Sequence, residues 1–377
     1  MKNQSRLAGS IMSQQDQRLT DLYRLVTNYT SKGHEKILPA PENEKLRWFE
    51  DFKFLNPASW AANPKKIPYI AATALIDSYS CLPRRPDMAF TYLWTAINNS
   101  YNDLFLTHNT VSKRLGDTKA IEKSLELISN ILQSNVENKA AIPDEYESKT
   151  INEIVIEFAK RLPDKTLNFL ASYILKGMAV TRHNGNQNTI KIREIHISSS
   201  YQTFANRFKA IHNHLYWNYG QNYSKICSIK EATDKTSVDY GISEANAEAS
   251  RKITRAMRKE LQRILVNKPM LDQFDTNGNS LPQDVSFASE IQRVEFLVFS
   301  LLYASRNNNI HGNVASRVNS IFSNADTITA ATWNFLFGYF YLSLLQLCLK
   351  QIDLDDLDIH LSNLKLLKVT SKDTKNK

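Results

Sequence analysis

The chain has 377 residues, of which 42% are hydrophobic, and its 47 Lys and Arg residues against 38 Asp and Glu give a net charge of +9. These values indicate a globular protein that is long enough to bury a substantial core in one large domain or two, and they exclude an acidic disordered chain. The positive surplus fits an anionic partner such as nucleic acid, or a basic surface with no specific ligand.

The cysteines and the hydropathy pattern indicate the cellular compartment in which we expect the protein. The three cysteines are odd in number, far apart and outside any C-x-x-C motif, which argues against a disulfide framework or a zinc site. No apolar run reaches the roughly 18–20 residues of a membrane span. Residues 1–19 lack the apolar centre of a secretion signal. We therefore expect a cytoplasmic protein without a membrane partner.

Few helix breakers interrupt the chain, which contains only 10 Gly and 11 Pro, so the composition favours an all-α fold. Apolar residues at helical spacing predict the helices 16–31, 69–80, 88–105, 119–136, 150–161, 165–180, 201–218, 243–266, 296–303 and 325–349. Residues 37–70 combine five prolines with aromatic side chains and predict an irregular or short-helical segment. Residues 190–197 alternate imperfectly and are the one candidate strand.

The helix predicted at 243–266 carries a basic stripe. Arg251, Arg255 and Arg258 lie at i, i+4 and i+7, so they share one face. This face is either a solvated surface or a groove for an RNA backbone.

No metal or cofactor motif accompanies these helices. Asp275 and Asn277 resemble the start of a calcium loop, but the glycine is misplaced and no Glu closes the loop. His212 and His214 alternate as H-x-H, a pattern that a surface pair explains better than a metal site. Phosphate-binding glycine loops and nucleophile-elbow motifs are absent from the sequence. We therefore expect no cofactor and no metal.

One polar cluster stands out because it directly follows the apolar helix at 296–303. Within six residues it contains Arg306, Asn307, Asn308, Asn309 and His311, followed by a glycine. Arg offers a planar cation for a phosphate and His moves protons near neutral pH, so the pair suits RNA cleavage without a metal.

The spacing of the two cationic residues limits how they act together. On an ideal helix Arg306 and His311 point about 140° apart. They converge if the helix ends between them, or if a dimer supplies half a site from each chain. Both residues could instead merely cap the C-terminus of a helix, where cations are favourable.

The segment RNNNIHG resembles the R-N-x-x-x-H-G signature of HEPN domains, an all-α family, and the helix MAFTYLWTAINNSYNDL resembles the first core helix of such domains. The resemblance covers residues 86–108 and 287–350. It implies a HEPN-type helical bundle (86–350) with a long helical insertion at about 109–286. Residues 1–85 would then form an N-terminal helical and irregular segment, and residues 351–377 a basic C-terminal tail.

Functionally, the resemblance implies a metal-independent endoribonuclease that leaves cyclic-phosphate ends, dimerises, and serves as a prokaryotic defence effector or toxin. If the roles of the motif residues in that family apply here, Arg306, His311 and Asn307 are catalytic, while Asn98 and Asn308 support them. The expected partners are RNA, a second copy of the chain, and an antitoxin or defence-system protein. The alternative is a non-catalytic HEPN scaffold that binds a nucleotide or a protein in the same place.

Some members paired with nucleotidyltransferase antitoxins have a Tyr two residues after the His. Here that position is Asn313, so regulation through such a modification is not expected.

Overall fold

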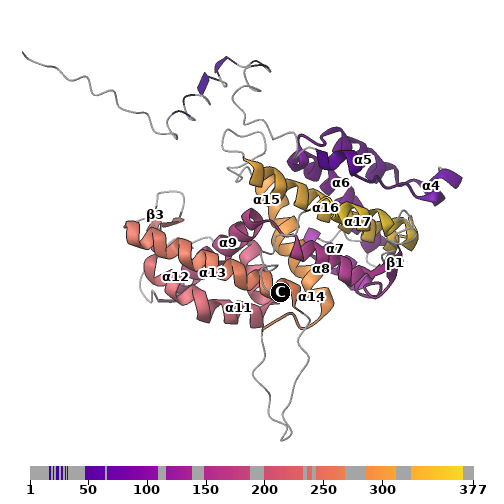
Figure 1. Cartoon of the computed structure of the whole chain (residues 1–377). Coiled ribbons are helices and arrows are strands. Elements are labelled where there is room, and N and C mark those ends of the chain that lie inside the picture. The colour runs from indigo at the N-terminus through magenta and orange to yellow at the C-terminus, as the bar shows by residue number, and fades with distance from the viewer. Residues whose placement is uncertain are drawn as a thin grey trace, which may run out of the picture.

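A computed structural model describes residues 47–63, 66–108, 116–137, 148–186, 199–231, 236–239, 243–267, 285–310 and 324–367, with scattered positions between 17 and 32. In these ranges the chain is an assembly of helices with two small hairpins, which confirms the predicted all-α class. Figure 1 shows α9 and α11–α13 on one side, α5–α8, α16 and α17 on the other, and α14 and α15 between them.

The elements of the N-terminal third are η1 (Arg47–Asp51, a 3-10 helix), α4 (Ala58–Ala62), α5 (Tyr69–Ser80), α6 (Pro86–His108) and α7 (Asp117–Ser129). The middle contains β1 (Asn135–Glu137), β2 (Ser148–Thr150), α8 (Ile151–Lys160), α9 (Asp164–Asn186), α10 (Ser199–Arg207), α11 (Lys209–Leu215), η4 (Tyr216–Gly220, a π-helix), α12 (Gln221–Ile226), β3 (Ser228–Glu231), β4 (Thr236–Asp239) and α13 (Glu244–Val266). The C-terminal part contains α14 (Glu290–Leu297), η5 (Val298–Tyr303, a π-helix), α15 (Ala304–Ile310), α16 (Ala325–Cys348), η6 (Leu354–Leu357, a 3-10 helix) and α17 (Asp358–Leu364).

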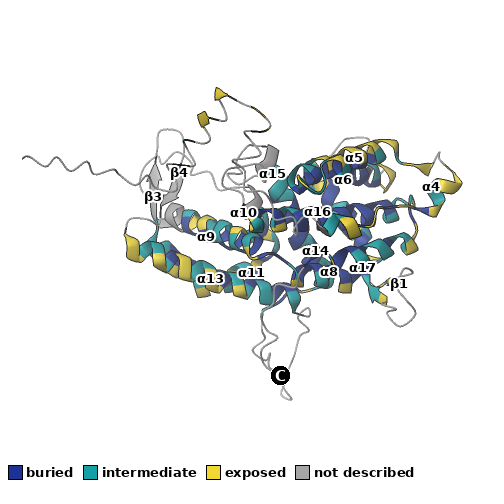
Figure 2. Cartoon of the chain, turned by 45° about the horizontal axis from the view of Figure 1, so that its top comes forward, coloured by how far each residue is buried: buried dark blue, intermediate teal, exposed yellow. Residues whose placement is uncertain are grey.

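The centre of the core is the pair α6 and α16, which pack along their length. α16 is apolar on all sides, and Figure 2 shows it enclosed by other helices. By length and composition alone α16 could cross a membrane, but 78% of its most apolar window is buried inside the protein. Gly338 permits the close approach, because a Cβ there would lie 3.0 Å from the ring of Phe90.

Local sequence signals set several helix starts. Thr150 caps α8 through a reciprocal box in which its hydroxyl accepts from the Glu153 amide at 3.1 Å, while the Glu153 carboxylate accepts from the Thr150 amide at 2.8 Å. Asn324 caps α16 by accepting from the Thr327 amide at 3.0 Å. Such caps satisfy amides that have no partner inside the helix.

Two predicted helices differ from the observed ones. The helix expected over 119–136 ends at Ser129, and its last residues instead enter a turn and strand β1. The helix expected over 201–218 breaks at Phe208. The buried Phe208 ring packs 5.3 Å from the ring of Phe296, so tertiary packing outweighs helical spacing there.

The two hairpins are antiparallel and local. β1 pairs with β2 in the register Asn135↔Thr150, Val136↔Lys149 and Glu137↔Ser148. β3 pairs with β4 in the register Ser228↔Asp239, Ile229↔Val238, Lys230↔Ser237 and Glu231↔Thr236. The strand expected at 190–197 lies outside the described residues.

The aromatic segment near the N-terminus packs on the main core. Phe52 lies 5.5 Å from the ring of Tyr339. The Tyr339 hydroxyl accepts from the Leu55 amide at 2.5 Å and pairs with the Tyr79 hydroxyl at 2.7 Å. Burial raises the pKa of Tyr79 to about 12, so these phenols stay neutral.

The segment expected to be a basic tail begins with folded structure. In residues 351–367, η6 and α17 place Leu357, Leu361 and Leu364 in the core. His360 is fully buried and its Nε2 lies 2.9 Å from the Ser343 hydroxyl of α16. The folded part therefore extends beyond residue 350, because the apolar residues of α17 cover α16.

One continuous core includes residues from each of the three predicted segments, and within the predicted insertion it takes in residues from Ala120 to Leu265. The Ser124 hydroxyl of α7 lies 3.0 Å from the Tyr341 hydroxyl, and Trp333 Nε1 donates to the Phe158 carbonyl of α8 at 3.0 Å. α7 and α8 thus pack directly on α16.

Candidate functional site

The polar cluster is carried by one helical run, α14–η5–α15, whose middle turns are π-helical. The apolar stretch predicted to be a buried helix is buried, with Leu301 and Leu302 fully enclosed. Trp94 of α6 packs against this run, its ring 6.1 Å from that of Tyr303. Trp94 is therefore part of the core that fixes α15, rather than an open stacking platform.

Arg306 projects from α15 with about one-fifth of its side chain exposed. Its Nη2 lies 3.5 Å from Oδ2 of Asp117, and its Nη1 donates to Oδ1 of Asn307 at 2.8 Å. The guanidinium carbon lies 5.8 Å from the centre of the Tyr303 ring. These contacts fix the orientation of the cation while leaving several of its five N–H donors unused.

Asp117 is the first residue of α7, where a carboxylate is favoured by the helix dipole. Nearby, Tyr101 of α6 is fully buried and lies beside Asp117. Burial first, and then the charge of Asp117, raise the pKa of Tyr101, while Arg306 opposes the shift. Three helices thus bring together a neutral phenol, a carboxylate and a guanidinium, those of Tyr101, Asp117 and Arg306.

Asn98, one of the two predicted supporting residues, has its hydrogen bond outside this cluster. Asn98 is half-buried, and its Oδ1 accepts from Nδ2 of Asn102 at 2.6 Å, one turn along α6. The structure therefore pairs Asn98 with Asn102 and not with Arg306. His311 and the side chain of Asn308 lie outside the described residues, so the pairing of Arg306 with His311 stays a prediction.

The predicted basic stripe on α13 divides in two. Arg251 and Arg255 line a cavity, together with residues of α9 and α12. Arg258 instead forms an ion pair, with its Nη1 3.0 Å from Oδ2 of Asp164 at the start of α9. Arg258 therefore joins two helices and is less suited to phosphate than the other two.

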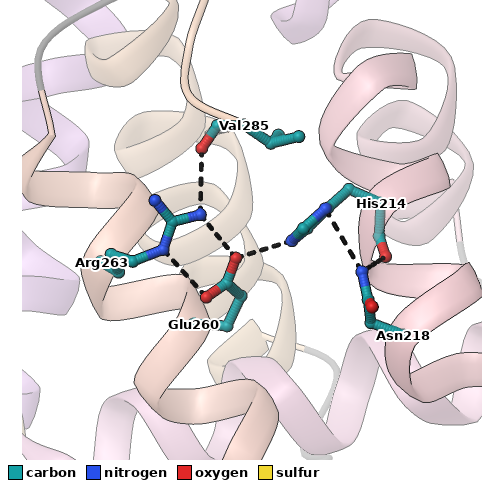
Figure 3. A network of polar contacts seen from close by, with 5 residues as sticks. All are labelled: His214, Asn218, Glu260, Arg263 and Val285. Atoms are coloured by element: carbon teal, nitrogen blue, oxygen red, sulfur yellow. Dashed lines mark hydrogen bonds and ion pairs between the residues drawn. The ribbon is translucent and has the colours of Figure 1, made fainter. Parts of the chain in front are cut away.

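The two histidines of the H-x-H pattern are engaged within the fold. Nε2 of His212 lies 2.9 Å from the Tyr201 hydroxyl, and burial lowers the pKa of His212. Nε2 of His214 lies 2.6 Å from Glu260, which also accepts two hydrogen bonds from Arg263 at 2.7 and 3.0 Å (Figure 3). The first contact connects α11 to α10 and the second connects α11 to α13, so both histidines are half-buried and engaged in the fold and do not form a solvated surface pair.

Glu260 is the centre of this network, and its pKa is lowered chiefly because Arg263 donates hydrogen bonds to the carboxylate. We expect Glu260→Gln to lower the free energy of unfolding by about 1–3 kcal/mol, because bonds to a charged acceptor are lost. Urea unfolding followed by circular dichroism measures the change. The matched control is Glu248→Gln, an exposed position of the same helix. Equal stability of the two variants would contradict a structural role for the network.

Sequence reasoning missed Asp117, Tyr101 and the contribution of α9 to the basic cavity. The one available signal was the position of Asp117 after Gly116 at a predicted helix start, which indicates a helix terminus but not its partner. Within the described ranges, no group of three or more His, Cys, Asp or Glu residues gathers at metal-binding distance.

Chemically, the cluster presents a fixed, partly exposed arginine beside an amide and a carboxylate. Such an arginine can donate to a phosphate or remain a structural ion pair. Comparison of the chain with family models, with curated proteins and with solved structures found no match.

Proposed function

We propose that this protein is a metal-independent endoribonuclease of HEPN type that acts as a prokaryotic defence effector or toxin. The observation that carries the proposal is the placement of Arg306 within the motif R-N-x-x-x-H-G. Its guanidinium is partly exposed at the end of a buried helix, and Asp117 and Asn307 orient it. An oriented cation costs little reorganisation when charge develops on a phosphate.

In the proposed reaction, the imidazole of His311 accepts the proton of an RNA 2′-hydroxyl. The 2′-oxygen then attacks the adjacent phosphorus, the bond from phosphorus to the 5′-oxygen breaks, and the His311 imidazolium returns its proton, directly or through water, to the leaving 5′-oxygen. The products are a 2′,3′-cyclic phosphate and a 5′-hydroxyl. Arg306 stabilises the negative charge on the phosphate oxygens.

In this proposal Asn307 orients Arg306, while Asn98 and Asn308 have supporting roles. Two copies of the chain would bring two Arg/His motifs to one cleft. An antitoxin or another defence-system protein would control the activity in the cytoplasm.

One observation favours a second candidate, a non-catalytic scaffold of the same fold that binds a nucleotide or a protein. The ion pair between Arg306 and Asp117 is what a structural arginine would form. In that case the pair connects α15 to α7 and Arg306 is not available for chemistry.

The deciding experiment is cleavage of a mixed RNA pool in the presence of EDTA, together with growth of bacteria that express the protein. We expect wild-type protein to cut RNA and to slow growth. Arg306→Ala and His311→Ala should each reduce the cleavage rate by about 10²–10³-fold, because one removes charge stabilisation and the other the base. Mass spectrometry of the products should show cyclic-phosphate ends.

The matched control is His212→Gln, since Arg207 and His212 repeat the five-residue spacing without the neighbouring Asn and Gly. This variant should cut RNA at nearly the wild-type rate. Full activity in the Arg306 and His311 variants would show that the catalytic assignment is wrong. A wild-type protein that neither cuts RNA nor slows growth would favour the scaffold.

A further inference from the structure

A cavity of about 330 Å³ lies between α9, α12 and α13, in the middle region that the HEPN resemblance does not cover. Figure 1 shows α9 and α13 side by side. The two helices run in opposite directions, since Asp164 early in α9 pairs with Arg258 late in α13. Lys176, later in α9, shares the cavity with Arg251, earlier in α13.

The lining is cationic. Lys176, Arg251 and Arg255 contribute three basic side chains, and no carboxylate lines the cavity. Arg251 and Arg255 are exposed and form no ion pair within the ranges that the structure describes, in contrast to Arg258. Within the same ranges, Arg255 Nε donates only to the Arg251 carbonyl, at 3.4 Å, so the terminal nitrogens of two guanidinium groups one helical turn apart are suited to binding a phosphate.

The rest of the lining includes further polar side chains, although most of its accessible surface is apolar and the cavity is open to solvent. Asn168, Ser172 and Thr254 offer amide and hydroxyl groups, and the buried Ser250 and Tyr223 lie behind them. The Thr254 hydroxyl donates to the Ser250 carbonyl at 2.9 Å, so its lone pairs remain available as acceptors. A ligand here meets the basic side chains together with neutral polar groups and apolar surface.

An aromatic pair lies next to this lining on α9. Phe169 and Tyr173 stack with ring centres 6.1 Å apart and an interplanar angle of 15°. Together with Lys176 they fall at i, i+4 and i+7, so the rings and the cation form one strip of the helix. Although it stacks on Tyr173, Phe169 remains 43% exposed, so part of its ring is accessible to a ligand.

We infer that this cavity binds the phosphate of a nucleotide, with the base stacked on Phe169 and Tyr173. The phosphate contacts Arg251, Arg255 and Lys176. The volume is at the lower end of the roughly 300–1,000 Å³ of small-ligand sites, which suits a ligand of the size of one nucleotide. The aromatic strip distinguishes a nucleotide from an inorganic anion, because rings bind bases by stacking.

The ligand is a free nucleotide or the 5′-phosphorylated end of a single-stranded RNA, since both present the same phosphate and base. The site is separate from Arg306 and does not require that the protein cleave RNA. A protein that does not bind nucleotide at this site can therefore be distinguished from one that does not cleave RNA.

The test is isothermal titration of the full-length protein with AMP, adenosine and inorganic phosphate at low ionic strength. A second arm uses 2′-O-methyl pentaadenylate with and without a 5′-phosphate. This RNA analogue has no free 2′-hydroxyl, so the proposed nuclease activity cannot cleave it during the titration. AMP or the phosphorylated pentamer should bind at least about tenfold more tightly than adenosine or inorganic phosphate, because only these ligands use both the arginines and the rings. Whichever of AMP and the phosphorylated pentamer binds more tightly shows whether the site takes a free nucleotide or the 5′ end of an RNA.

Three variants complete the test. Arg251→Ala combined with Arg255→Ala should weaken binding by at least about tenfold, because two charge-assisted contacts are lost. Phe169→Ala should weaken AMP by about fivefold or more and leave inorganic phosphate unchanged. The matched control Lys252→Ala removes one charge from an exposed position of α13 outside the cavity and should change binding by less than about twofold.

Absence of binding by both AMP and the phosphorylated pentamer would overturn the site. Wild-type affinity in the double arginine variant would do the same. An unchanged AMP affinity in Phe169→Ala would overturn the assignment of the base to the aromatic strip.

Discussion

Replacing Arg293 by alanine is expected to lower the free energy of unfolding by about 3–4 kcal/mol, among the largest effects of any single substitution in this chain. The side chain is completely buried in the core. Its Nε donates to the Leu265 carbonyl at 2.8 Å, its Nη1 to Oδ1 of Asn152 at 3.2 Å, and its Nη2 to the Asn267 carbonyl. Alanine would leave these buried acceptors without partners.

The charge of Arg293 is compensated nearby. Burial lowers its pKa, and the carboxylate of Glu290 one turn earlier acts in the opposite direction. Glu290 is itself held by Asn152, whose Nδ2 donates at 2.8 Å, and by Gln133. Arg293 thus connects the start of α14 to α8 and to the end of α13, so its loss affects three elements together.

Urea unfolding followed by circular dichroism measures this effect, with Lys259→Ala as the control. Lys259 is exposed on α13, so its removal should change stability by less than about 0.5 kcal/mol. Arg293→Met keeps most of the side-chain volume but loses the hydrogen bonds. Comparing it with Arg293→Ala therefore separates the contribution of packing from the contribution of the hydrogen bonds. If both Arg293 variants lose less than about 1 kcal/mol, the buried network does not stabilise the fold as argued.

Acidification from pH 7 to pH 4 is expected to remove about 3 kcal/mol of stability through His360 alone. Burial lowers the pKa of His360 to about 3, against an ordinary value of 6.5. The folded state keeps the imidazole neutral, whereas the unfolded chain binds a proton below about pH 6.5. The contribution is therefore fully present above that pH and is lost as the pH falls toward 3.

The surroundings explain this shift. Phe340 and Tyr339 contact the imidazole edge-on, with ring centres 5.1 and 5.3 Å away. Nδ1 has no hydrogen-bond partner within the described ranges, and Nε2 is paired with Ser343. Neither neighbouring ring nor the hydroxyl can stabilise an imidazolium as a carboxylate would.

The measurement is a series of urea unfolding curves at pH 7, 6, 5 and 4 for wild type and His360→Gln. Glutamine can retain a hydrogen bond to Ser343 but does not titrate. Carboxylates contribute equally to both proteins, so the wild type should lose about 3 kcal/mol more than the variant over this range. Parallel pH profiles would show that His360 is not held neutral by the fold.

The spacing of apolar residues along the sequence was enough to predict most of the helices. Apolar residues at helical spacing predicted α5, α8, α9, α13 and α16, because the positions that a helix buries recur along the sequence itself. The same reasoning predicted that the run 296–303 is buried and that the fold is all-α. Spacing also placed Arg251 and Arg255 on one face of α13.

Contacts between distant residues were not predictable in this way. The break at Phe208 follows from its packing against Phe296, and the folded residues 351–367 follow from the cover that α17 gives to α16. Both outcomes depend on which surfaces meet after folding. Helical spacing alone contains no information about those partners.

The sequence by itself determined the helical class, the buried helix that carries Arg306, and the chemical types available in the motif around it. Only the tertiary structure decided that Arg306 pairs with Asp117, that Arg258 pairs with Asp164, and that Lys176 joins Arg251 and Arg255 around one cavity. The physical reason is that periodicity depends on neighbours along one helix. An ion pair or a cavity between helices depends on side chains that the sequence separates by many residues and that packing alone brings together.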